Sequence, residues 1–241
     1  MKHPIAKFIA VAVVMVMASV GILRLRSNAS GRQLTLPRWV YRILGLAPLQ
    51  IELPRPMFIS TPMNIRVSNL RAPLRSMRPP FLAPTGTANI ALDKPVSASD
   101  DAPIIGRIEM VTDGDKAAAE GSFVELAPFL QHVTIDLEEP HQIFAVVVWH
   151  YHRQPRVYFD VVVQTADDPD FITNVKTLFN NDMDHSAGLG VGTDMHYIEA
   201  NQGELIDAKG IEARYVRLYS NGNTANELNH YVEVEVHGRP L

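Results

Sequence analysis

The residues best suited to hold a metal ion form a short acidic turn, Met110-Val111-Thr112-Asp113-Gly114-Asp115. Calcium prefers several oxygen ligands, from carboxylates and backbone carbonyls, on an irregular loop. Asp113 and Asp115 offer the carboxylates, and Gly114 allows the tight bend. A structural interpretation is equally open, in which the Asp113 side chain accepts backbone N–H bonds and caps an ordinary turn. The turn therefore predicts either a calcium site or a capped loop.

A second candidate site is the aromatic and basic run Trp149-His150-Tyr151-His152-Arg153-Gln154-Pro155-Arg156, where a predicted strand passes into a loop. The imidazoles of His150 and His152 are too few by themselves to make a transition-metal site. A sugar pocket uses an aromatic face for the ring and Arg or His donors for the hydroxyls. The candidate ligand-binding residues here are Trp149, His150, His152, Arg153 and Arg156. The alternative is that Trp149 packs in the core while the polar residues cap the rim of the domain.

Two loops add further candidates. Residues 180–197 are Gly-rich and acidic, but no Gly-Lys-Ser or Gly-Lys-Thr sequence and no helix follows, so a phosphate loop is excluded. This loop is expected to cross one end of the domain, where Asp182 or Asp184 would add to a binding surface. In residues 220–226, the amides of Asn221 and Asn223 either bond sugar hydroxyls or satisfy their own backbone.

No catalytic set emerges from these residue types. A hydrolase needs a nucleophile with its base, or two carboxylates in a cleft, and neither pattern is present. We therefore predict a protein that is not an enzyme. Nucleic acid is not an expected partner, because the part of the chain that should fold is acidic and would repel phosphates.

Charge divides the chain into two unlike halves. Residues 1–85 hold 12 of the 22 Lys and Arg and a single acid, Glu52, which gives a balance of +11. Residues 86–241 hold the other 10 basic residues and 25 acidic ones, a balance of −15. Such an asymmetry indicates a basic arm joined to an acidic globule. Cysteine is absent, so neither disulfides nor thiolate metal sites are expected.

The amino-terminal segment is predicted to be a membrane anchor over residues 1–27. Residues 8–23 contain no charge and are followed by Arg24 and Arg26. As a helix, this run and its flanks would span ~30 Å, about the thickness of the hydrocarbon layer, with the arginines reaching towards headgroups. A cleaved signal peptide is the alternative, but the small-residue site at residues 27–29 lies beyond both arginines.

Residues 28–85 form the basic arm, with nine of the 17 prolines and eight arginines from residue 30 onwards. Within it, residues 37–46 predict a short helix that begins at a proline and ends at Gly45. The helix would place Trp39, Ile43 and Leu46 on one side and Arg42 near the flank, which suits either a membrane surface or packing on the globule. The candidate membrane-interface residues are Arg24, Arg26, Trp39 and Arg42.

Beyond residue 46, the arm mixes prolines with many large apolar residues. Disordered linkers are normally poor in such residues. We therefore expect the strip to be ordered against its own globule, against anionic lipid or against a partner subunit. A solvated linker remains the alternative.

The globule, residues 86–241, reads as short β-type runs separated by turn signals, with no long amphipathic helix. The fold class is therefore all-β, an antiparallel β-sandwich preceded by one transmembrane helix and an extended arm rich in Pro and Arg. The predicted strands are VTIDL at 133–137, IFAVVVW at 143–149, VYFDVVVQ at 157–164, ARYVRLYS at 213–220 and YVEVEVHG at 231–238.

Five segments also carry a family resemblance: NIALDKPVSAS (89–99), the VTDGD turn (111–115), VTIDLEEPHQIFAVVVW, ARYVRLYS and YVEVEVHG. In this order they resemble the discoidin family, which includes the coagulation factor V/VIII C-type domains, fucolectins and related modules of the galactose-binding-like fold. The resemblance implies a discoidin-like jelly roll over residues 89–238. Many members carry a tryptophan after the acidic turn, whereas this chain has Lys116-Ala117-Ala118-Ala119, so the loop is expected to follow another path.

The resemblance also implies roles for particular residues. In fucolectin-like relatives, the acidic turn and a Glu at the start of the last strand hold a structural calcium ion. Here the corresponding ligands are Asp113, Asp115 and Glu233, with Ser122 and the Met110 carbonyl as further candidates. Fucolectins bind sugar with one His and two Arg. Only Arg156 is compatible with one of those positions, so fucose specificity is not predicted.

Two functions remain open at this point. The first is a membrane-anchored binding module that recognises carbohydrate or another external polar ligand, as discoidin-like domains usually do. The second is an accessory subunit that docks on other membrane-protein subunits through its anchor and arm. Domains of this type mostly work outside the cytoplasm, so we expect a single-pass protein whose globule is periplasmic or extracellular. The arginines that follow the anchor favour the opposite orientation.

Overall fold

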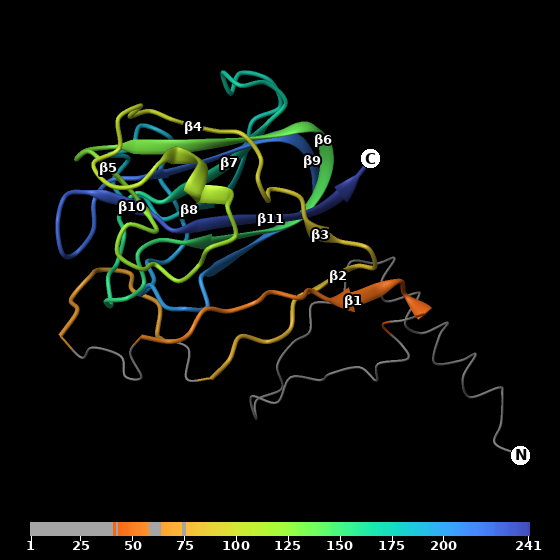
Figure 1. The fold of residues 1–241 in the computed structure, drawn as a ribbon, viewed down its shortest axis with the longest axis horizontal. Coiled ribbons are helices and arrows are strands. Elements are labelled where there is room, and N and C mark those ends of the chain that lie inside the picture. Colours follow the sequence, from red (N-terminus) through yellow and green to blue (C-terminus); the bar gives the residue numbers. More distant parts are fainter. Residues whose placement is uncertain (1–40, 42, 58–63, 74–75) are drawn as a thin grey trace, which may run out of the picture. The chain divides into compact units, whose positions relative to one another are not determined.

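The structure is a computed structural model that describes residues 41, 43–57, 64–73 and 76–241 (Figure 1). The predicted anchor at residues 1–27 lies outside these residues, and so do the interface candidates Arg24, Arg26, Trp39 and Arg42. Within the described part, no helix combines the length and the hydropathy needed to cross a bilayer.

The chain divides into two compact units, of which the smaller comprises Met1–Pro48 and Leu82–Thr85. Its described part contains the end of the short predicted helix, because Tyr41 and Ile43 are helical. Gly45 adopts a left-handed φ of 65°, which suits its predicted role as the stop. Leu46 was expected within the helix, and this was wrong. It begins strand β1 (Leu46–Pro48), which pairs antiparallel with β2 (Leu82–Pro84).

The larger unit comprises Leu49–Phe81 and Gly86–Leu241, and its centre is one long antiparallel pair. Strand β6 (Gln131–Trp149) runs against β9 (Glu204–Ser220) along almost its whole length. The two strands predicted at 133–137 and 143–149 are therefore a single strand. The ladder shifts register between Asp136 and His141, where Pro140 lies. Proline is tolerated there because an irregular position requires no ladder N–H.

Shorter strands complete the sheet on both sides of this pair. β4 (Val96–Ala98) lies against the first half of β6, and β11 (Glu233–Pro240) lies against the second half. β3 (Ala88–Asn89) extends the sheet from β11, while β7 (Val162–Ala166) and β8 (Lys176–Asn180) extend it from β9. A separate pair joins β5 (Val124–Leu126) to β10 (Asn229–Tyr231), and a 3-10 turn, η1, spans Ile108–Thr112.

The core shows that this sheet closes over itself as a sandwich. Val133 and Ile135 from the first half of β6 belong to the same buried cluster as Val146 and Val148 from the second half. Figure 1 shows β6 bending back between these halves. All strand pairs of the described chain are antiparallel, so the all-β prediction is confirmed.

One predicted strand is shorter than expected. The run at 157–164 contributes to the sheet only from Val162, because Asp160 takes a left-handed φ of 50° that interrupts an extended backbone. Before that kink, Tyr158 forms a single bridge to Asn223. The residues between β6 and β7 therefore form a loop that lies beside the loop after β9.

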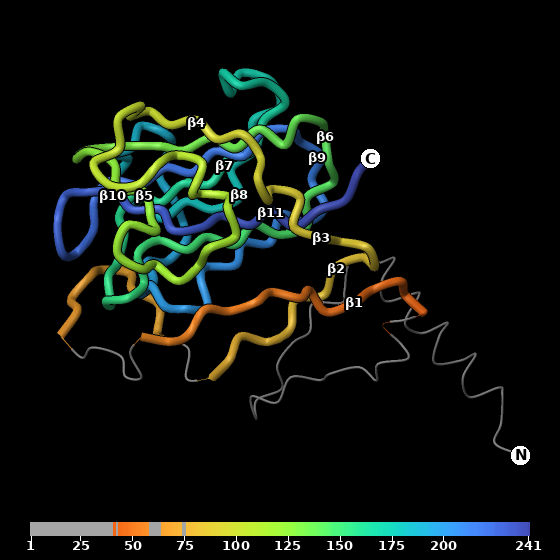
Figure 2. The backbone as a smooth tube through the Cα atoms, viewed as in Figure 1, coloured from red at the N-terminus to blue at the C-terminus, as the bar shows by residue number. Residues whose placement is uncertain are grey.

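The described parts of the arm beyond residue 48 are ordered against their own globule (Figure 2). Ile51 and Leu53 pack on the cluster that contains Trp149, and the Asn201 amide donates to Pro54 O at 2.9 Å. Further along, Leu70 bridges in parallel to His196. The composition of the arm predicted packing on its own globule, on anionic lipid or on a partner subunit. The structure shows the first of these for the described residues beyond 48.

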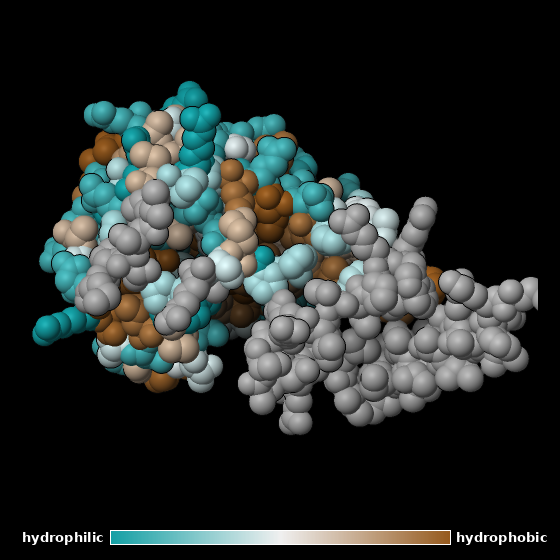
Figure 3. Space-filling view, turned by 90° about the horizontal axis from the view of Figure 1, so that it is seen from below, coloured by the Kyte–Doolittle hydropathy of each residue, from teal (hydrophilic) through white to brown (hydrophobic). Residues whose placement is uncertain are grey.

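The arm alternates as an extended chain should when one side is covered. Ile65 and Val67 are half-buried, whereas Asn64, Arg66 and Ser68 are exposed. Apolar side chains also reach the described surface, where Figure 3 shows brown patches set among teal ones. Beyond residue 48, the exposed large apolar residues of the arm are Met57 and Met77.

Two arginines fix the arm by polar contacts. Arg71 forms a bidentate ion pair with Glu204, at 2.9 and 2.6 Å, and its guanidinium lies 5.6 Å from the ring centre of Tyr197. The side chain of Glu204 is 9 % exposed and that of Arg71 is 42 % exposed. Arg78 donates to the carbonyls of Gln202 and Gly203. The arm thus provides the counter-charge for a buried carboxylate of the sandwich.

Replacing Arg71 by Met should destabilise the full-length chain, because the buried carboxylate of Glu204 would lose its partner. The free energy of unfolding should fall by roughly 1–3 kcal/mol, a moderate loss since the guanidinium is partly exposed to water. Urea denaturation followed by circular dichroism measures it. Arg66→Met, an exposed arginine of the same arm, is the matched control and should change little. An unchanged midpoint for Arg71→Met would mean that the ion pair does not hold the arm.

Candidate functional site

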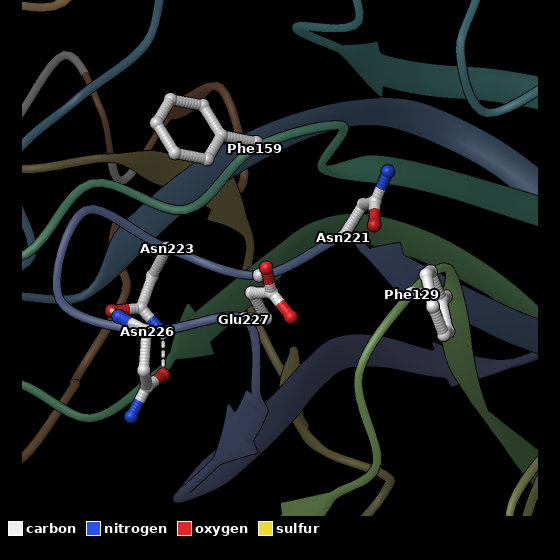
Figure 4. Close-up of a pocket in the computed structure, with 7 residues that line it drawn as sticks. Phe129, Phe159, Asn221, Asn223, Asn226 and Glu227 are labelled. Atoms are coloured by element: carbon white, nitrogen blue, oxygen red, sulfur yellow. Dashed lines mark hydrogen bonds between the residues drawn. The ribbon is translucent and has the colours of Figure 1, made fainter.

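A pocket of about 270 Å³ opens where three loops of the sandwich meet (Figure 4). Phe129 comes from the loop between β5 and β6, and Phe159 from the loop between β6 and β7. The loop between β9 and β10 supplies the remaining lining residues, which are Asn221, Gly222, Asn223, Asn226 and Glu227. Two aromatic rings, three amides and one carboxylate therefore surround the same space.

Phe129 is the most unusual residue of the pocket. Its side chain is 79 % exposed, and its backbone takes a left-handed φ of 70°. Non-glycine residues rarely adopt this conformation, and such strain persists only where the surrounding contacts impose it. An exposed aromatic ring held on a strained backbone is a suitable platform for a ligand.

The amide of Asn229 imposes that conformation. Asn229 is fully buried in β10, and its Nδ2 donates to the carbonyl oxygens of Ala127 and Phe129, both at 2.9 Å. Its Oδ1 accepts the N–H of Gly222 at 2.9 Å. One side chain therefore joins the loop that presents Phe129 to the loop that forms the opposite part of the pocket.

The loop after β9 is fixed by its own hydrogen bonds. Asn223 Nδ2 donates to Asn226 Oδ1 at 2.7 Å and to Leu228 O at 2.9 Å, while its Oδ1 accepts the N–H of Ala225 at 2.9 Å. The amide of Asn223 thus satisfies its own backbone, which is one of the two roles that the sequence left open.

Asn221 connects the same loop to the Phe159 loop. Its Nδ2 donates to Asp160 Oδ2 at 2.8 Å, and its backbone N–H donates to Phe159 O at 2.9 Å. In return, the Phe159 N–H donates to Gly222 O at 3.1 Å. One N–H of the Asn221 amide is therefore occupied, while its Oδ1 is available to a ligand.

Asp160 also belongs to a group of three carboxylates. Its ligand atoms and those of Asp182 and Asp184 lie within 4.8 Å of one another. Asp182 is buried, and its two oxygens accept backbone N–H groups of Asp184, Ser186 and Ala187. These bonds organise the long loop at residues 180–197, so the group has a structural role beside the pocket loops.

The structure places Trp149, His150 and His152 inside the domain, away from the pocket lining. The Trp149 Nε1–H donates to Asn201 O at 3.0 Å. His150 Nδ1 lies 2.6 Å from Glu199 Oε1, and His152 Nε2 lies 2.8 Å from Lys116 O. The Trp149 indole has no exposed face, so it packs in the core, as the alternative interpretation of the sequence expected.

Arg153 and Arg156 are half-buried and do not line the pocket either. The Arg156 guanidinium lies 4.6 Å from the ring centre of Tyr151 and donates to Gln154 Oε1 at 3.2 Å. Nearby, the Tyr158 hydroxyl lies 2.9 Å from His230 Nδ1. Burial, together with the charge of Arg156, lowers the pKa of His230 to about 3, so this imidazole is neutral at physiological pH.

The acidic turn has the backbone caps expected of an ordinary turn and the nearby glutamate expected of a calcium site. Asp113 Oδ1 accepts the N–H of Asp115 at 2.8 Å, and Asp115 Oδ1 accepts the N–H of Ala117 at 2.9 Å, so both aspartates cap the turn. Glu233 comes from the start of β11 and accepts the Gly114 N–H at 3.0 Å. The fold therefore brings the distant glutamate against the turn.

Glu233 is fully buried, and its Oε1 has no hydrogen-bond partner within the described chain. Burial raises its pKa to about 8, and the charges of Glu235 and Asp113 act in the same direction. The nearby cation Lys116 pairs with Glu235, which also bonds His237 at 2.9 Å. A buried oxygen without a partner, beside the exposed Asp113, fits the donor set of a hard cation.

The other two suggested metal ligands have structural contacts. The Ser122 N–H donates to Ala119 O at 2.9 Å, and Met110 packs its side chain against the main core. Of the suggested ligands, the fold groups Asp113 and Asp115 of the turn with Glu233 of β11.

Sequence reasoning found two of the pocket residues, Asn221 and Asn223, and missed the residues that matter most. Phe129 follows Pro128 in a short apolar run that resembles core, and its exposure has no local signal. Asn229 is a single amide in a strand-like run. The signal for Asn229 was an amide within a strand-like run, because a buried amide must find hydrogen-bond partners.

The chain is similar to several solved structures, at low sequence identity. No protein-family model matches the chain, and no curated protein matches it. Among solved structures, CBM32 of AlyQ, in complex with 4,5-unsaturated mannuronic acid, is 21% identical over 60% of this chain and 95% of that one, with a TM-score of 0.45. A Streptococcus pneumoniae fucose binding module, SpX-3, is 18% identical over 62% of this chain and 96% of that one, with a TM-score of 0.44.

A larger protein also matches over one of its parts. The family 89 glycoside hydrolase from Clostridium perfringens, in complex with 2-acetamido-1,2-dideoxynojirmycin, is 14% identical over 63% of this chain, with a TM-score of 0.46. The match covers 15% of that hydrolase chain.

Replacing Asn229 by Asp should separate the two pocket loops. The variant keeps an acceptor for the Gly222 N–H but sets a carboxylate against the carbonyl oxygens of Ala127 and Phe129. The free energy of unfolding should fall by about 1–3 kcal/mol, and hydrogen exchange should increase around residues 127–129. Asn226→Asp is the control, since its exposed amide nitrogen makes no hydrogen bond within the described residues. Equal exchange in both variants would contradict the bridging role.

Proposed function

We propose that the larger unit is a non-catalytic carbohydrate-binding domain that holds a sugar ring against Phe129. The observation that carries this proposal is an exposed aromatic ring beside loops whose polar groups are already fixed. The apolar face of a sugar ring packs on an aromatic side chain, while its hydroxyls bond to nearby polar groups. Fixed loops lose little conformational entropy on binding, which favours affinity for a small polar ligand.

The chemistry of the pocket supports binding without catalysis. Glycoside hydrolysis requires two carboxyl groups on either side of the scissile bond. Glu227 is the single carboxylate among the residues that line this pocket. The resemblance of residues 89–238 to discoidin-like domains supports the same conclusion, because that family consists largely of binding domains.

We also propose that residues 1–27 anchor the protein in a membrane, with the domain on the periplasmic or extracellular side. The uncharged run at residues 8–23 and its flanking arginines support this proposal. A second proposal is that the protein is an accessory subunit that docks on other membrane-protein subunits through its anchor and arm. It relies on the exposed side of the arm, with Arg66, Met57 and Met77, since the other side is covered by the protein's own domain.

A calcium ion is proposed at the acidic turn, where it would tie the turn to the last strand. Glu233 and Asp113 would be its carboxylate ligands, and Asp115 would supply further oxygen. Two facts support the ion: the unpartnered Oε1 of Glu233 and the high pKa of that group without a cation. A bound divalent cation favours the ionised carboxylate and removes the repulsion between the two acids.

The sugar-binding proposal is tested on Phe129. The detergent-solubilised full-length chain is applied to a glycan array, and the best ligand is then titrated by calorimetry. Phe129→Ala should weaken binding by about tenfold or more, because the ring loses a buried aromatic contact of roughly 1.5–3 kcal/mol. Ile172→Ala removes an equally exposed apolar side chain from another loop and should have no effect. An array without any bound glycan would overturn the proposal.

The calcium proposal is tested through pH. With a chelator, Glu233 has its usual pKa of 4.5 when unfolded and a pKa of about 8 when folded, so folding favours the protonated form. This contribution to stability is fully present below pH 4.5 and is lost as the pH rises through about 8.

Calcium should therefore raise the Tm chiefly at the alkaline end of this window, as measured by differential scanning calorimetry. Glu233→Gln should abolish both the pH effect and the calcium effect. Glu120→Gln, an exposed acid of the same region, should preserve both. A Tm at pH 8 that does not respond to calcium would contradict the site.

A further inference from the structure

The side-chain atoms that the pocket leaves free are mostly hydrogen-bond acceptors. Asn223 uses its whole amide within the loop, and Asn221 directs one of its two N–H groups to Asp160. The acceptors that remain are Oδ1 of Asn221 and the carboxylate of Glu227, for which no partner exists among the described residues. In Figure 4 the Glu227 carboxylate lies among the labelled side chains, whereas the amide nitrogen of Asn226 points away from it.

The residues that line and adjoin the pocket carry negative charge. Glu227 is the sole ionisable residue among the lining residues, and Asp160 lies directly behind Asn221, 2.8 Å from its amide nitrogen. The faces of Phe129 and Phe159 add to this, because the face of an aromatic ring attracts cations. The carboxylate, the amide oxygen and the two rings therefore favour the same type of ligand, a cationic donor.

We infer that this pocket selects sugars that carry a protonated amine, such as hexosamine units with a free amino group, over neutral and acidic sugars. The inference rests on the proposed function and names the ligand class of the same site. An ammonium group offers three donors and no acceptor, so it complements Glu227 and Asn221 Oδ1. The sugar ring then packs on Phe129.

The same groups act against other sugar classes. A uronate or a sulfated sugar would bring acceptors and negative charge towards Glu227, and none of the described residues that line the pocket is a cation that could offset them. An N-acetylated amine lacks the charge and donates one hydrogen bond in place of three. A charge-assisted hydrogen bond is about twice as strong as a neutral one, so the preference should be about tenfold or more.

The test compares matched oligosaccharides on the full-length chain. Glucosamine oligomers, their fully N-acetylated counterparts and oligogalacturonates of equal length are titrated at low ionic strength. Glucosamine oligomers should bind about tenfold or more tightly than the other two. This preference should decline as the pH rises through the pKa of the ligand amine, and also as salt is added, because both weaken the attraction to Glu227.

Two variants locate the effect. Glu227→Gln should reduce glucosamine binding to the level of the N-acetylated oligomer, since the amide removes the charge and keeps the shape. Glu212→Gln removes an exposed carboxylate of β9 outside the pocket and should leave the preference unchanged.

The outcomes separate the two proposals. Binding that is equal for all three oligomers, or tightest for the oligogalacturonate, would overturn the amine preference and leave sugar binding in place. A preference that survives Glu227→Gln would also overturn it. If no oligomer binds, and the glycan array is blank, both proposals are wrong.

Discussion

The buried amide of Asn229 is the contact on which the binding region depends. An amide in the core is tolerated only if its donors and its acceptor are satisfied. Asn229 meets this requirement with the backbone of two loops, through Ala127 and Phe129 on one side and Gly222 on the other. The same bonds hold Phe129 in an unfavourable conformation with its ring exposed. Satisfying one polar group inside the domain therefore shapes the surface outside it.

Buried carboxylates impose a similar requirement elsewhere in the domain. Glu204 is paired with Arg71, which comes from the arm more than a hundred residues earlier. Glu199 bonds His150 through one oxygen, and both Glu199 and Glu233 keep a second oxygen without a partner in the described chain. A charge buried without compensation is costly, so each group points to something that must lie beside it. The partner of Glu204 is Arg71 of the arm, and residues 49–81 belong to the same unit as the sandwich.

The pocket combines these constraints in a form that supports the proposed binding function. Its loops are fixed before any ligand arrives, by Asn223 within one loop and by Asn221 between two. A small set of acceptors remains unsatisfied beside the exposed ring of Phe129 and the half-buried ring of Phe159. Such a surface suits a polar ligand with a flat apolar face and many donors, and a sugar has these properties. One carboxylate without a second opposite it suits recognition more than bond cleavage.

The sequence by itself determined the class of fold and the division of charge. Alternating valine-rich runs specify strands, because side chains on a strand point to opposite faces with a period of two. It also identified the acidic turn, while the role of Trp149 stayed open between pocket and core.

Tertiary structure decided what the pocket is made of. Phe129, Phe159 and Asn221 lie on three different loops, and only the register of β6 against β9 brings those loops together. Local sequence does not encode hydrogen bonds between such distant segments. It therefore could not show that Asn229 would bond the backbone of Phe129, or that Ile51 and Leu53 of the arm would pack on the cluster that contains Trp149.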